Sequence, residues 1–308
     1  MDGKKNELIG IIYGILAYSA WGILPLYWKL LSAIPAHEIL AHRIFWSFIF
    51  VGGLMFFSGS WQPIRDVFKS RSNIILIFLC AVIISVNWGI YIWAVNSKQV
   101  VEASMGYYIN PLVVFLFSVT ILKEQLNTWQ IISIILAAIG VIIITVQYGK
   151  VPWIALGLAL TFALYGLLKK ILKVDSLVGL AIETTIIAPV ALAYILYRQS
   201  QGTGAVGVVS LVTTLILFAS GIATATPLLW FAKAAQRIKF STIGFLQYIA
   251  PTITLFLGVV IFKEQFTTIH LLSFSFIWAA LIIYSLSNVG FLRKKVHQTK
   301  LIKEVSKI

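Results

Sequence analysis

Two segments of this chain repeat one pattern at a spacing of 140 residues. The first is Y-I-N-P-L-V-V-F-L-F-S-V-T-I-L-K-E-Q-L-N-T, residues 108–128, and the second is Y-I-A-P-T-I-T-L-F-L-G-V-V-I-F-K-E-Q-F-T-T, residues 248–268. They share a tyrosine, a proline, the triplet Lys-Glu-Gln and a threonine in one register, with 11 apolar or small residues between the proline and the triplet. The match predicts that the chain consists of two related halves.

The composition around these segments is that of a membrane protein. Of the 308 residues, 60% are hydrophobic and 11% are charged, and the mean hydropathy is +0.95. A soluble domain carries about 25% charged residues, whereas a bilayer solvates apolar outer faces. The net charge of +14 does not indicate nucleic-acid binding, because the basic residues lie in short blocks between apolar runs. The lone cysteine, Cys80, excludes an internal disulfide framework.

Ten apolar runs are long enough to cross a membrane, which takes about 20 residues of helix. They cover residues 8–30, 36–57, 73–97, 101–122, 127–147, 152–171, 176–197, 207–232, 240–262 and 267–288. We therefore predict an all-α polytopic membrane protein with ten transmembrane helices. If the N-terminus is cytoplasmic, 18 of the 24 Lys and Arg residues fall on the cytoplasmic side, which agrees with the positive-inside rule. Both termini are expected there.

The number of spans in each half predicts the symmetry of the fold. Residues 1–148 and residues 149–288 each contain five spans, and residues 289–308 form a basic tail that we expect in the cytoplasm. Since five is odd, the second half must enter the membrane in the opposite sense. The result is an inverted-topology repeat, whose central cavity can open to either side of the membrane.

Three features of the spans carry a family resemblance. They are the five-plus-five layout, an aromatic–Gly pair in the first span of each half (Trp21-Gly22, Tyr165-Gly166) and an acidic residue closing each fourth span (Glu124, Glu264). Together they resemble the EamA-type branch of the drug/metabolite transporter superfamily. The segment His42-Arg43-Ile44-Phe45-Trp46-Ser47 is similar to the RarD-type permeases (chloramphenicol-sensitive protein). The resemblance implies residence in a bacterial inner membrane and export of small organic molecules.

Charged side chains inside the spans are candidates for the transport pathway, because a charge at mid-membrane costs roughly 2.5–3.5 kcal/mol. Arg43 lies about 10 Å into the second span, after His42, and Glu183 is its equivalent in the seventh. We expect Arg43 and His42 to bind an anionic group and Glu183 to be a proton or cation site. The alternative is a local contact with the backbone. Glu102 is a further proton candidate, or an acid stabilised by a helix N-terminus.

Proline, amide and aromatic residues complete the candidate site. Pro111 and Pro251 are predicted to kink the fourth and ninth spans, either to shape the pathway or to serve packing alone. Eight further residues are expected to line the cavity: Asn87, Trp88, Tyr91, Tyr107, Tyr108, Asn110, Gln247 and Tyr248. Aromatic rings with polar edges suit an amphipathic solute. For Glu124 and Glu264 we expect ion pairs that close the turns after the fourth and ninth spans.

The sequence contains no signature of an enzyme or of an ATP-driven pump. It has no P-loop, no nucleotide-binding glycine fingerprint and no His-Glu-x-x-His motif, and we expect no cofactor and no metal. We therefore predict a secondary transporter, an exporter of a small amphipathic metabolite or drug-like molecule, that works by alternating access as a monomer or homodimer. Protons are the candidate coupling ion. The alternatives are a membrane enzyme or scaffold subunit, and a channel-like facilitator.

Overall fold

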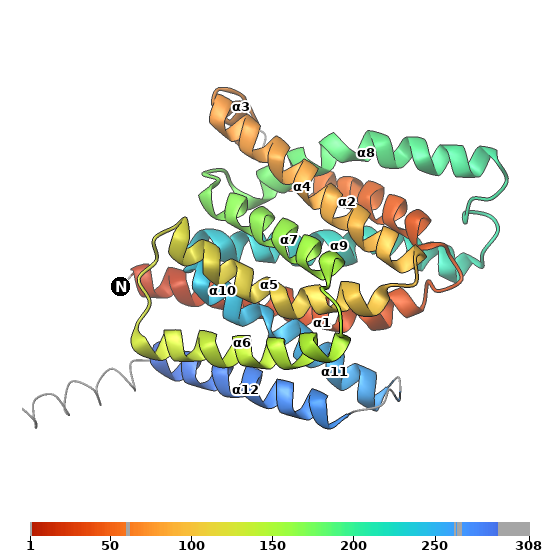
Figure 1. Ribbon diagram of the computed structural model, residues 1–308. Coiled ribbons are helices and arrows are strands. Elements are labelled where there is room, and N and C mark those ends of the chain that lie inside the picture. Colours follow the sequence, from red (N-terminus) through yellow and green to blue (C-terminus); the bar gives the residue numbers. More distant parts are fainter. Residues whose placement is uncertain (1, 60–61, 262, 264–266, 289–308) are drawn as a thin grey trace, which may run out of the picture.

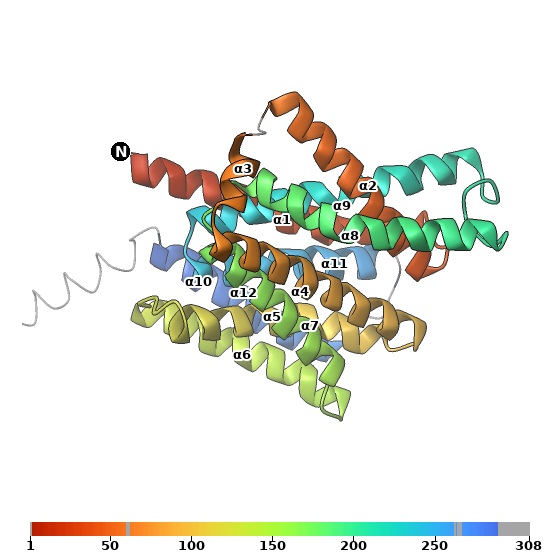
Figure 2. The same cartoon turned by 90° about the horizontal axis from the view of Figure 1, so that it is seen from above.

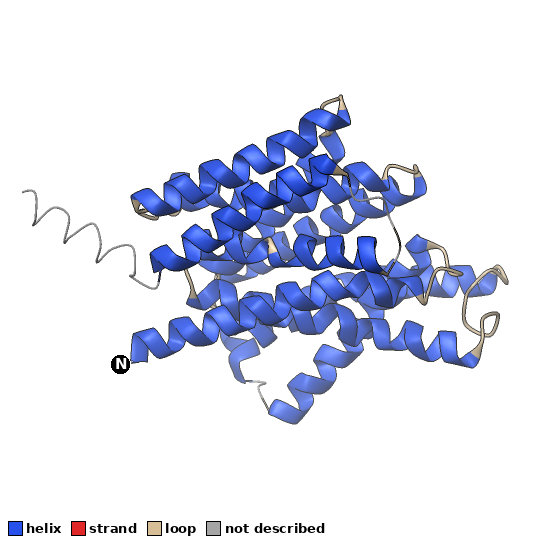
Figure 3. Cartoon of the chain, turned by 90° about the horizontal axis from the view of Figure 1, so that it is seen from below, coloured by secondary structure: helices blue, strands red, loops and turns tan. Residues whose placement is uncertain are grey.

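The computed structural model describes residues 2–59, 62–261, 263 and 267–288, and every regular element in these ranges is a helix (Figures 1 and 3). In chain order the helices are α1 (Asp2–Lys29), α2 (Ala36–Ser58), α3 (Gln62–Phe68), α4 (Arg71–Asn96), α5 (Val100–Thr120), α6 (Thr128–Tyr148), α7 (Trp153–Ile171), α8 (Ser176–Ser200), α9 (Leu211–Arg237), α10 (Phe240–Gln247), α11 (Ile249–Val260) and α12 (Thr268–Asn288). Glu264 and the basic tail lie outside the described residues.

Ten stretches of these helices are long and apolar enough to cross a membrane, which confirms the prediction of an all-α protein with ten spans. Two details differ from the prediction. Helix α3 has seven residues and lies in the loop before the third span, where no helix was expected. The ninth span, Phe240–Val260, consists of two helices, α10 and α11, that meet at Tyr248.

The two prolines lie in different surroundings. Pro251 is in the first turn of α11, three residues after the break at Tyr248. It has no N–H to donate to the carbonyl of Gln247, and its ring crowds that carbonyl, which accounts for the interruption. Pro111 lies inside α5, which continues through it as one helix.

Local sequence signals explain where several helices begin and end. Helix α6 starts with a capping box, in which the Asn127 side chain accepts from the backbone N–H of Gln130 at 3.0 Å and the Gln130 side chain accepts from the backbone N–H of Asn127 at 2.9 Å. It ends at Gly149, which has a φ of 76° that suits glycine. The repeat-equivalent lysines Lys123 and Lys263 also share a left-handed conformation, with φ of 54° and 58°.

The helices pack side by side in one bundle. Helix α6 lies along α12 at one edge of the bundle (Figures 1 and 2), and Ser273 of α12 donates to the Gly140 carbonyl of α6 at 2.6 Å. Helix α5 packs against α7 and α10, and α1 packs against α9 and α11. Helix α2 lies between α8 and α9. Charged residues of α2, α7 and α8 thereby face the interior.

Close packing of α2 on α9 depends on Gly221. The Ser47 hydroxyl of α2 donates to the Gly221 carbonyl of α9 at 3.1 Å. A Cβ atom at position 221 would overlap the backbone of Trp46, and backbone cannot move aside as a flexible side chain can.

Gly221→Ala is expected to lower the free energy of unfolding by about 2 kcal/mol or more, although alanine favours helix by about 1 kcal/mol. The measurement is thermal unfolding of the purified protein in detergent. The matched control is Gly52→Ala in α2, where an added Cβ meets nothing within 4 Å, so its Tm should stay constant or rise. Equal Tm values for the two variants would contradict the packing described here.

Candidate translocation site

The proximal end of the bundle is the one at which α1 begins, marked N in Figure 1, and the distal end is the one at which α1 ends. Because the spans alternate in direction, α8 begins at the proximal end and α2 begins at the distal end. Glu183 therefore lies in the proximal half of the bundle and Arg43 in the distal half, about seven residues into their helices.

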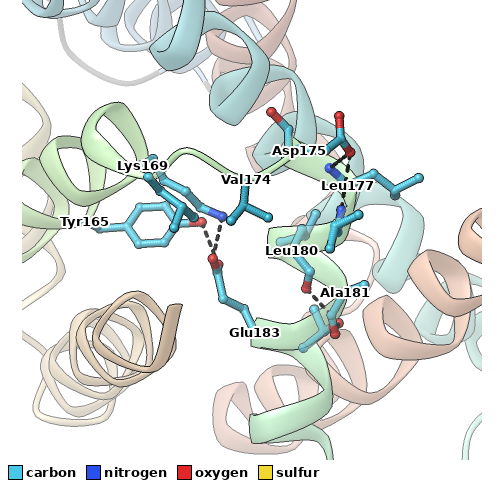
Figure 4. Close-up of polar contacts among 12 residues, drawn as sticks. Tyr165, Lys169, Val174, Asp175, Leu177, Leu180, Ala181 and Glu183 are labelled. Carbon is cyan, nitrogen blue, oxygen red and sulfur yellow. Dashed lines mark hydrogen bonds and ion pairs between the residues drawn. The ribbon is translucent and has the colours of Figure 1, made fainter. Parts of the chain in front are cut away.

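Glu183 forms a buried ion pair that the sequence analysis did not anticipate. The Lys169 ammonium, in the last turn of α7, lies 2.5 Å from the Glu183 carboxylate of α8, and the Tyr165 hydroxyl donates to the same carboxylate at 3.2 Å. The side chains of Lys169 and Glu183 are 1% and 2% exposed. Figure 4 shows Tyr165 and Lys169 reaching from one face of α7 toward Glu183. The two charges neutralise each other away from water.

The 18 basic residues that the positive-inside rule assigned to the cytoplasmic side include Lys169 with its neighbours Lys170 and Lys173. The structure separates these residues: Lys169 is buried, whereas Lys173 is exposed. A usable signal did exist, since Tyr165 and Lys169 are four residues apart and must lie on the same helix face. The sequence did not reveal that this face points at α8.

A cavity lies beside the ion pair. Its volume is about 20 Å³, enough for one water molecule. Five helices supply its walls, and the lining includes Ser47 of α2, Trp88 of α4, Tyr165 of α7, Glu183 of α8 and Ala225 of α9. Glu183 therefore both helps to line this cavity and forms the ion pair with Lys169.

Arg43 is held between two tryptophan rings. Its guanidinium carbon lies 5.1 Å from the centre of the Trp28 ring and 5.0 Å from that of the Trp88 ring, distances at which a cation and an aromatic face attract each other. Tyr91 of α4 and Tyr107 of α5 lie in the electrostatic surroundings of Arg43, and Tyr107 is 56% exposed. Trp88 touches Arg43 and lines the cavity beside Glu183, so it connects the two charged sites.

His42 faces a different neighbour from Arg43. It is 2% exposed, and its ring is stacked with Phe218 of α9 at 6.5 Å between ring centres. Trp46 donates to the Nδ1 atom of His42 at 3.4 Å. The Nε2 atom of His42 is buried and has no hydrogen-bond partner among the described residues.

Of the other predicted lining residues, some pack helices together and some lie at the α10–α11 break. Asn87 and Asn110 donate to backbone carbonyls of α7, Leu158 at 3.0 Å and Ala159 at 2.6 Å, so they bind α4 and α5 to α7. Tyr108 packs edge-on against Phe274 of α12. Gln247 and Tyr248 lie at the α10–α11 break, and the Gln247 amide oxygen and Tyr248 hydroxyl are buried without a partner in the described part of the chain.

At the proximal end, Glu124 caps a helix of the other half of the chain. Its carboxylate accepts from the backbone N–H groups of Phe240 at 2.6 Å and Ser241 at 3.0 Å, and from the Ser241 hydroxyl at 2.7 Å. It thus satisfies N–H groups in the first turn of α10, where the helix dipole also favours a negative charge. The expectation of an ion pair within its own turn is wrong for Glu124: it takes part in none of the ion pairs found among the described residues. The corresponding expectation for Glu264 falls outside those residues.

Two further contacts join the same elements. The Lys170 ammonium donates to the Ile238 carbonyl at 2.5 Å, and the Gln236 amide donates to the Val174 carbonyl at 2.7 Å. Together with the Glu124 cap, these contacts connect the α5–α6 turn, the end of α7 and the α7–α8 turn to the end of α9 and the start of α10. We call these three contacts the proximal closure.

Polar contacts at the distal end join other partners. Glu38 of α2 accepts from the Ala205 backbone N–H at 2.5 Å, in the loop between α8 and α9. Glu102 of α5 accepts from the Tyr148 hydroxyl at 2.7 Å and from the Ile154 backbone N–H, at the start of α7, at 2.8 Å. Arg43 and Trp28 thus belong to the group α1–α2–α8–α9. Trp88, Tyr91 and Tyr107 belong to the group α4–α5–α6–α7, and the Arg43 site lies between the two.

No cluster of three or more His, Cys, Asp or Glu side chains that could hold a metal ion occurs within the described ranges. Among the described residues, the Lys169–Glu183 pair lies beside the cavity, Arg43 contacts the cavity-lining Trp88, and Glu38 and Glu102 are buried nearer the distal end. Charges kept inside membrane helices at such a cost typically mark the path of a solute or ion. The fold and this interior define a polytopic membrane protein of the transporter class.

Comparison with known proteins gives the family. The chain belongs to the EamA-like transporter family, whose model matches residues 8–146 and 150–286. It is 46% identical over 291 residues to the "Uncharacterized transporter YojE" of Bacillus subtilis (92% of this chain, 96% of the relative). It is 40% identical over 295 residues to "Protein RarD" of Salmonella typhi (96% and 100%). A crystal structure described as "Crystal structure of protein" shares the fold, with a TM-score of 0.70 at 17% identity over 90% of this chain and 97% of that one.

The buried ion pair is expected to respond as a unit to mutation. Glu183→Gln leaves the Lys169 ammonium buried without a counter-charge, and Lys169→Met does the same to the carboxylate, so each is expected to lower the free energy of unfolding by about 3–5 kcal/mol. The double variant should lose much less than the sum. Unfolding in detergent measures all three.

The exposed pair Asp66–Lys69 is the matched control. Its charged atoms are 2.7 Å apart, but its Lys and Asp side chains are 75% and 66% exposed, and such pairs couple by about 0–1 kcal/mol. If the Lys169 and Glu183 substitutions were additive like those at the control pair, the two charges would not depend on each other.

Proposed function

We propose that this protein is a secondary transporter of the bacterial cytoplasmic (inner) membrane, which exports a small amphipathic molecule by alternating access between two inverted repeats. The observation that carries the proposal is the pair of charged sites, Arg43 and Glu183–Lys169, on either half of the bundle around Trp88. Two supporting facts concern the repeats. The family model matches the chain twice, once in each half, and Arg43 and Glu183 are separated by the same 140 residues as the repeated segments.

In this proposal the proximal end is cytoplasmic. The basic residues lie mainly at this end, as the positive-inside rule requires. The proximal closure then shuts the pathway on the cytoplasmic side. On the outer side, Arg43 lies between two groups of helices that can separate without breaking either the Glu38 or the Glu102 contacts. The arrangement corresponds to a conformation that is closed inward and poised to open outward.

Glu183 is the proposed coupling site. While it is ionised, it neutralises Lys169 inside the bundle. A proton that reaches Glu183 through the adjacent cavity leaves the Lys169 ammonium without its partner in a low-dielectric region, which is unfavourable. Lys169 is in the last turn of α7, so a shift of α7 away from α9 and α10 would bring it to cytoplasmic water. Protonation would thereby favour opening of the cytoplasmic side.

The proposal assigns roles to the remaining residues. The outer part of the pathway, beside Arg43, is lined by Trp88, Tyr91 and Tyr107. His42 precedes Arg43 on α2. Gln247 and Tyr248 lie at the α10–α11 break, where the Gln247 amide oxygen and the Tyr248 hydroxyl are buried without a hydrogen-bond partner among the described residues. Asn87, Tyr108 and Asn110 act through helix packing around the pathway. Pro111 and Pro251 shape the fourth and ninth spans.

The transport activity is tested by comparing compounds released by a deletion strain with those released by a strain that overexpresses the protein. A compound released only on overexpression is then loaded into proteoliposomes, with and without a pH gradient. Arg43→Ala and Glu183→Gln are expected to reduce its flux at least tenfold without loss of membrane insertion. Lys69→Gln, at an exposed lysine of the short loop after α3, is the control and should transport normally.

The outcomes separate the alternatives. A saturable flux that depends on the pH gradient supports a coupled carrier. A flux that does not saturate would indicate a channel, and turnover of the compound without flux would indicate an enzyme. Normal flux in both Arg43→Ala and Glu183→Gln would remove the site assignment.

The proximal closure is tested with the native cysteine. Cys80 of α4 is 0% exposed and lies close enough to Glu183 and Lys169 to interact with their charges. Glu124→Ala removes three hydrogen bonds to a charged acceptor, each worth about 1.5–3 kcal/mol, so the cytoplasmic side should open more often. The rate at which a membrane-impermeant maleimide labels Cys80 in inside-out vesicles is expected to rise about tenfold or more.

Glu7→Ala removes an exposed acid at the same end of the bundle and is the control, with labelling at the wild-type rate. If Glu124→Ala labelled no faster than this control, the cap would not contribute to closure. Faster labelling in right-side-out vesicles instead would reverse the proposed orientation.

A further inference from the structure

Arg43 lies about seven residues inside α2, and no carboxylate pairs with it among the described residues. Each buried acid within the described spans has other partners: Glu38 contacts the Ala205 N–H and, at 3.6 Å, Arg198. Glu102 contacts Tyr148 and Ile154, and Glu183 contacts Lys169. The Nε atom of Arg43 is buried and has no hydrogen-bond partner in this part of the chain.

The two tryptophans determine how a ligand can approach this cation. A guanidinium is planar, and its N–H groups point outward along its edges. The rings of Trp28 and Trp88 lie over it at 5.1 Å and 5.0 Å, which leaves the edges for hydrogen bonding. A planar group with two acceptor oxygens, a carboxylate, matches such an edge through two parallel hydrogen bonds.

The surroundings indicate what the carboxylate is attached to. Trp88 and Tyr91 belong to one helix and lie close to one face of it, since they are three positions apart, and Tyr107 belongs to α5. Aromatic side chains of this kind provide flat apolar contact area with polar edges. One cation among aromatic rings fits a single negative charge on a flat apolar body, and the Tyr91 and Tyr107 hydroxyls suit the polar edge of such a molecule.

We propose that Arg43 binds the carboxylate of an aromatic or similarly flat monocarboxylate, whose apolar body lies against Trp88 and Tyr91. This inference rests on the proposed transport function and names its substrate class. It gives the arginine a physical reason to remain in the membrane interior: the ligand supplies the counter-charge that the described part of the chain does not. A neutral analogue would leave the guanidinium edge unpaired and would bind weakly.

Binding to the purified protein in detergent tests the proposal without a transport assay. The probes are benzoate, its neutral analogue benzamide, and inorganic phosphate, each measured by the shift in Tm over a concentration series. Benzoate is expected to stabilise the wild-type protein in a saturable way, and benzamide and phosphate to have at least a tenfold weaker effect. Arg43→Gln should weaken benzoate binding about tenfold to a hundredfold. Arg43→Lys, which keeps the charge without the fork, should lie between.

Two comparisons separate a binding role from a structural one. Arg43→Gln removes a cation that has no carboxylate partner, but also its two cation–π contacts, so its Tm without ligand should stay close to that of the wild type. Lys98→Gln, at an exposed lysine of the distal end, changes the net charge equally and should bind benzoate as the wild type does. Trp88→Leu keeps Arg43 but removes one ring, and is expected to weaken benzoate binding.

The proposal is overturned if benzamide binds as well as benzoate, if phosphate binds better, or if Arg43→Gln leaves benzoate binding intact. If Arg43→Gln were much less stable than the wild type without ligand, Arg43 would have a structural role, and the other two variants would decide. Benzoate binding at the wild-type level by both Arg43→Lys and Trp88→Leu would then refute the site. Specific benzoate binding without flux of any compound would leave this inference intact and refute the transporter. Flux of a neutral compound without benzoate binding would support the transporter and refute the carboxylate site.

Discussion

The interior of this bundle depends on one electrostatic constraint: a charge that leaves water must have a partner. Lys169 and Glu183 meet this constraint together at 2.5 Å, with Tyr165 as a further donor to the carboxylate (Figure 4). Because the lysine comes from α7 and the glutamate from α8, the pair holds these helices in one relative position. A water-sized cavity, which Glu183 helps to line, lies beside the pair.

Arg43 meets the same constraint only in part. Two tryptophan faces stabilise the guanidinium, but cation–π contacts do not satisfy its N–H groups. The contrast between the paired charges near one end and the single charge near the other is a feature that suits a carrier. In the proposed mechanism, one site loses its internal partner on protonation, and the other gains a partner from the solute. Trp88, which borders both, is where one site can affect the other.

Hydrogen bonds to backbone groups at helix ends form the second set of contacts that join distant parts of the chain. Glu124 caps α10 from the turn between α5 and α6, so the start of the ninth span is tied to a part of the chain more than a hundred residues away. The same span is interrupted at Tyr248. At the other end, Glu38 and Glu102 each join helices within one group, which leaves the boundary between the groups free of these contacts.

The sequence by itself determined the ten spans, the all-α class and the family resemblance. Hydropathy and length decide these, because lipid demands long apolar helices whatever their neighbours are. It also pointed to Arg43 and Glu183 as costly charges. The tertiary structure decided their partners: Lys169 for Glu183, two tryptophans for Arg43, and the start of α10 for Glu124. These partners lie on other helices, and the sequence does not encode the rotation of one helix against another in any local pattern. Likewise, Pro111 and Pro251 predict a disturbance in both spans, but only the tertiary structure shows that the ninth span breaks at Tyr248 while α5 continues through Pro111.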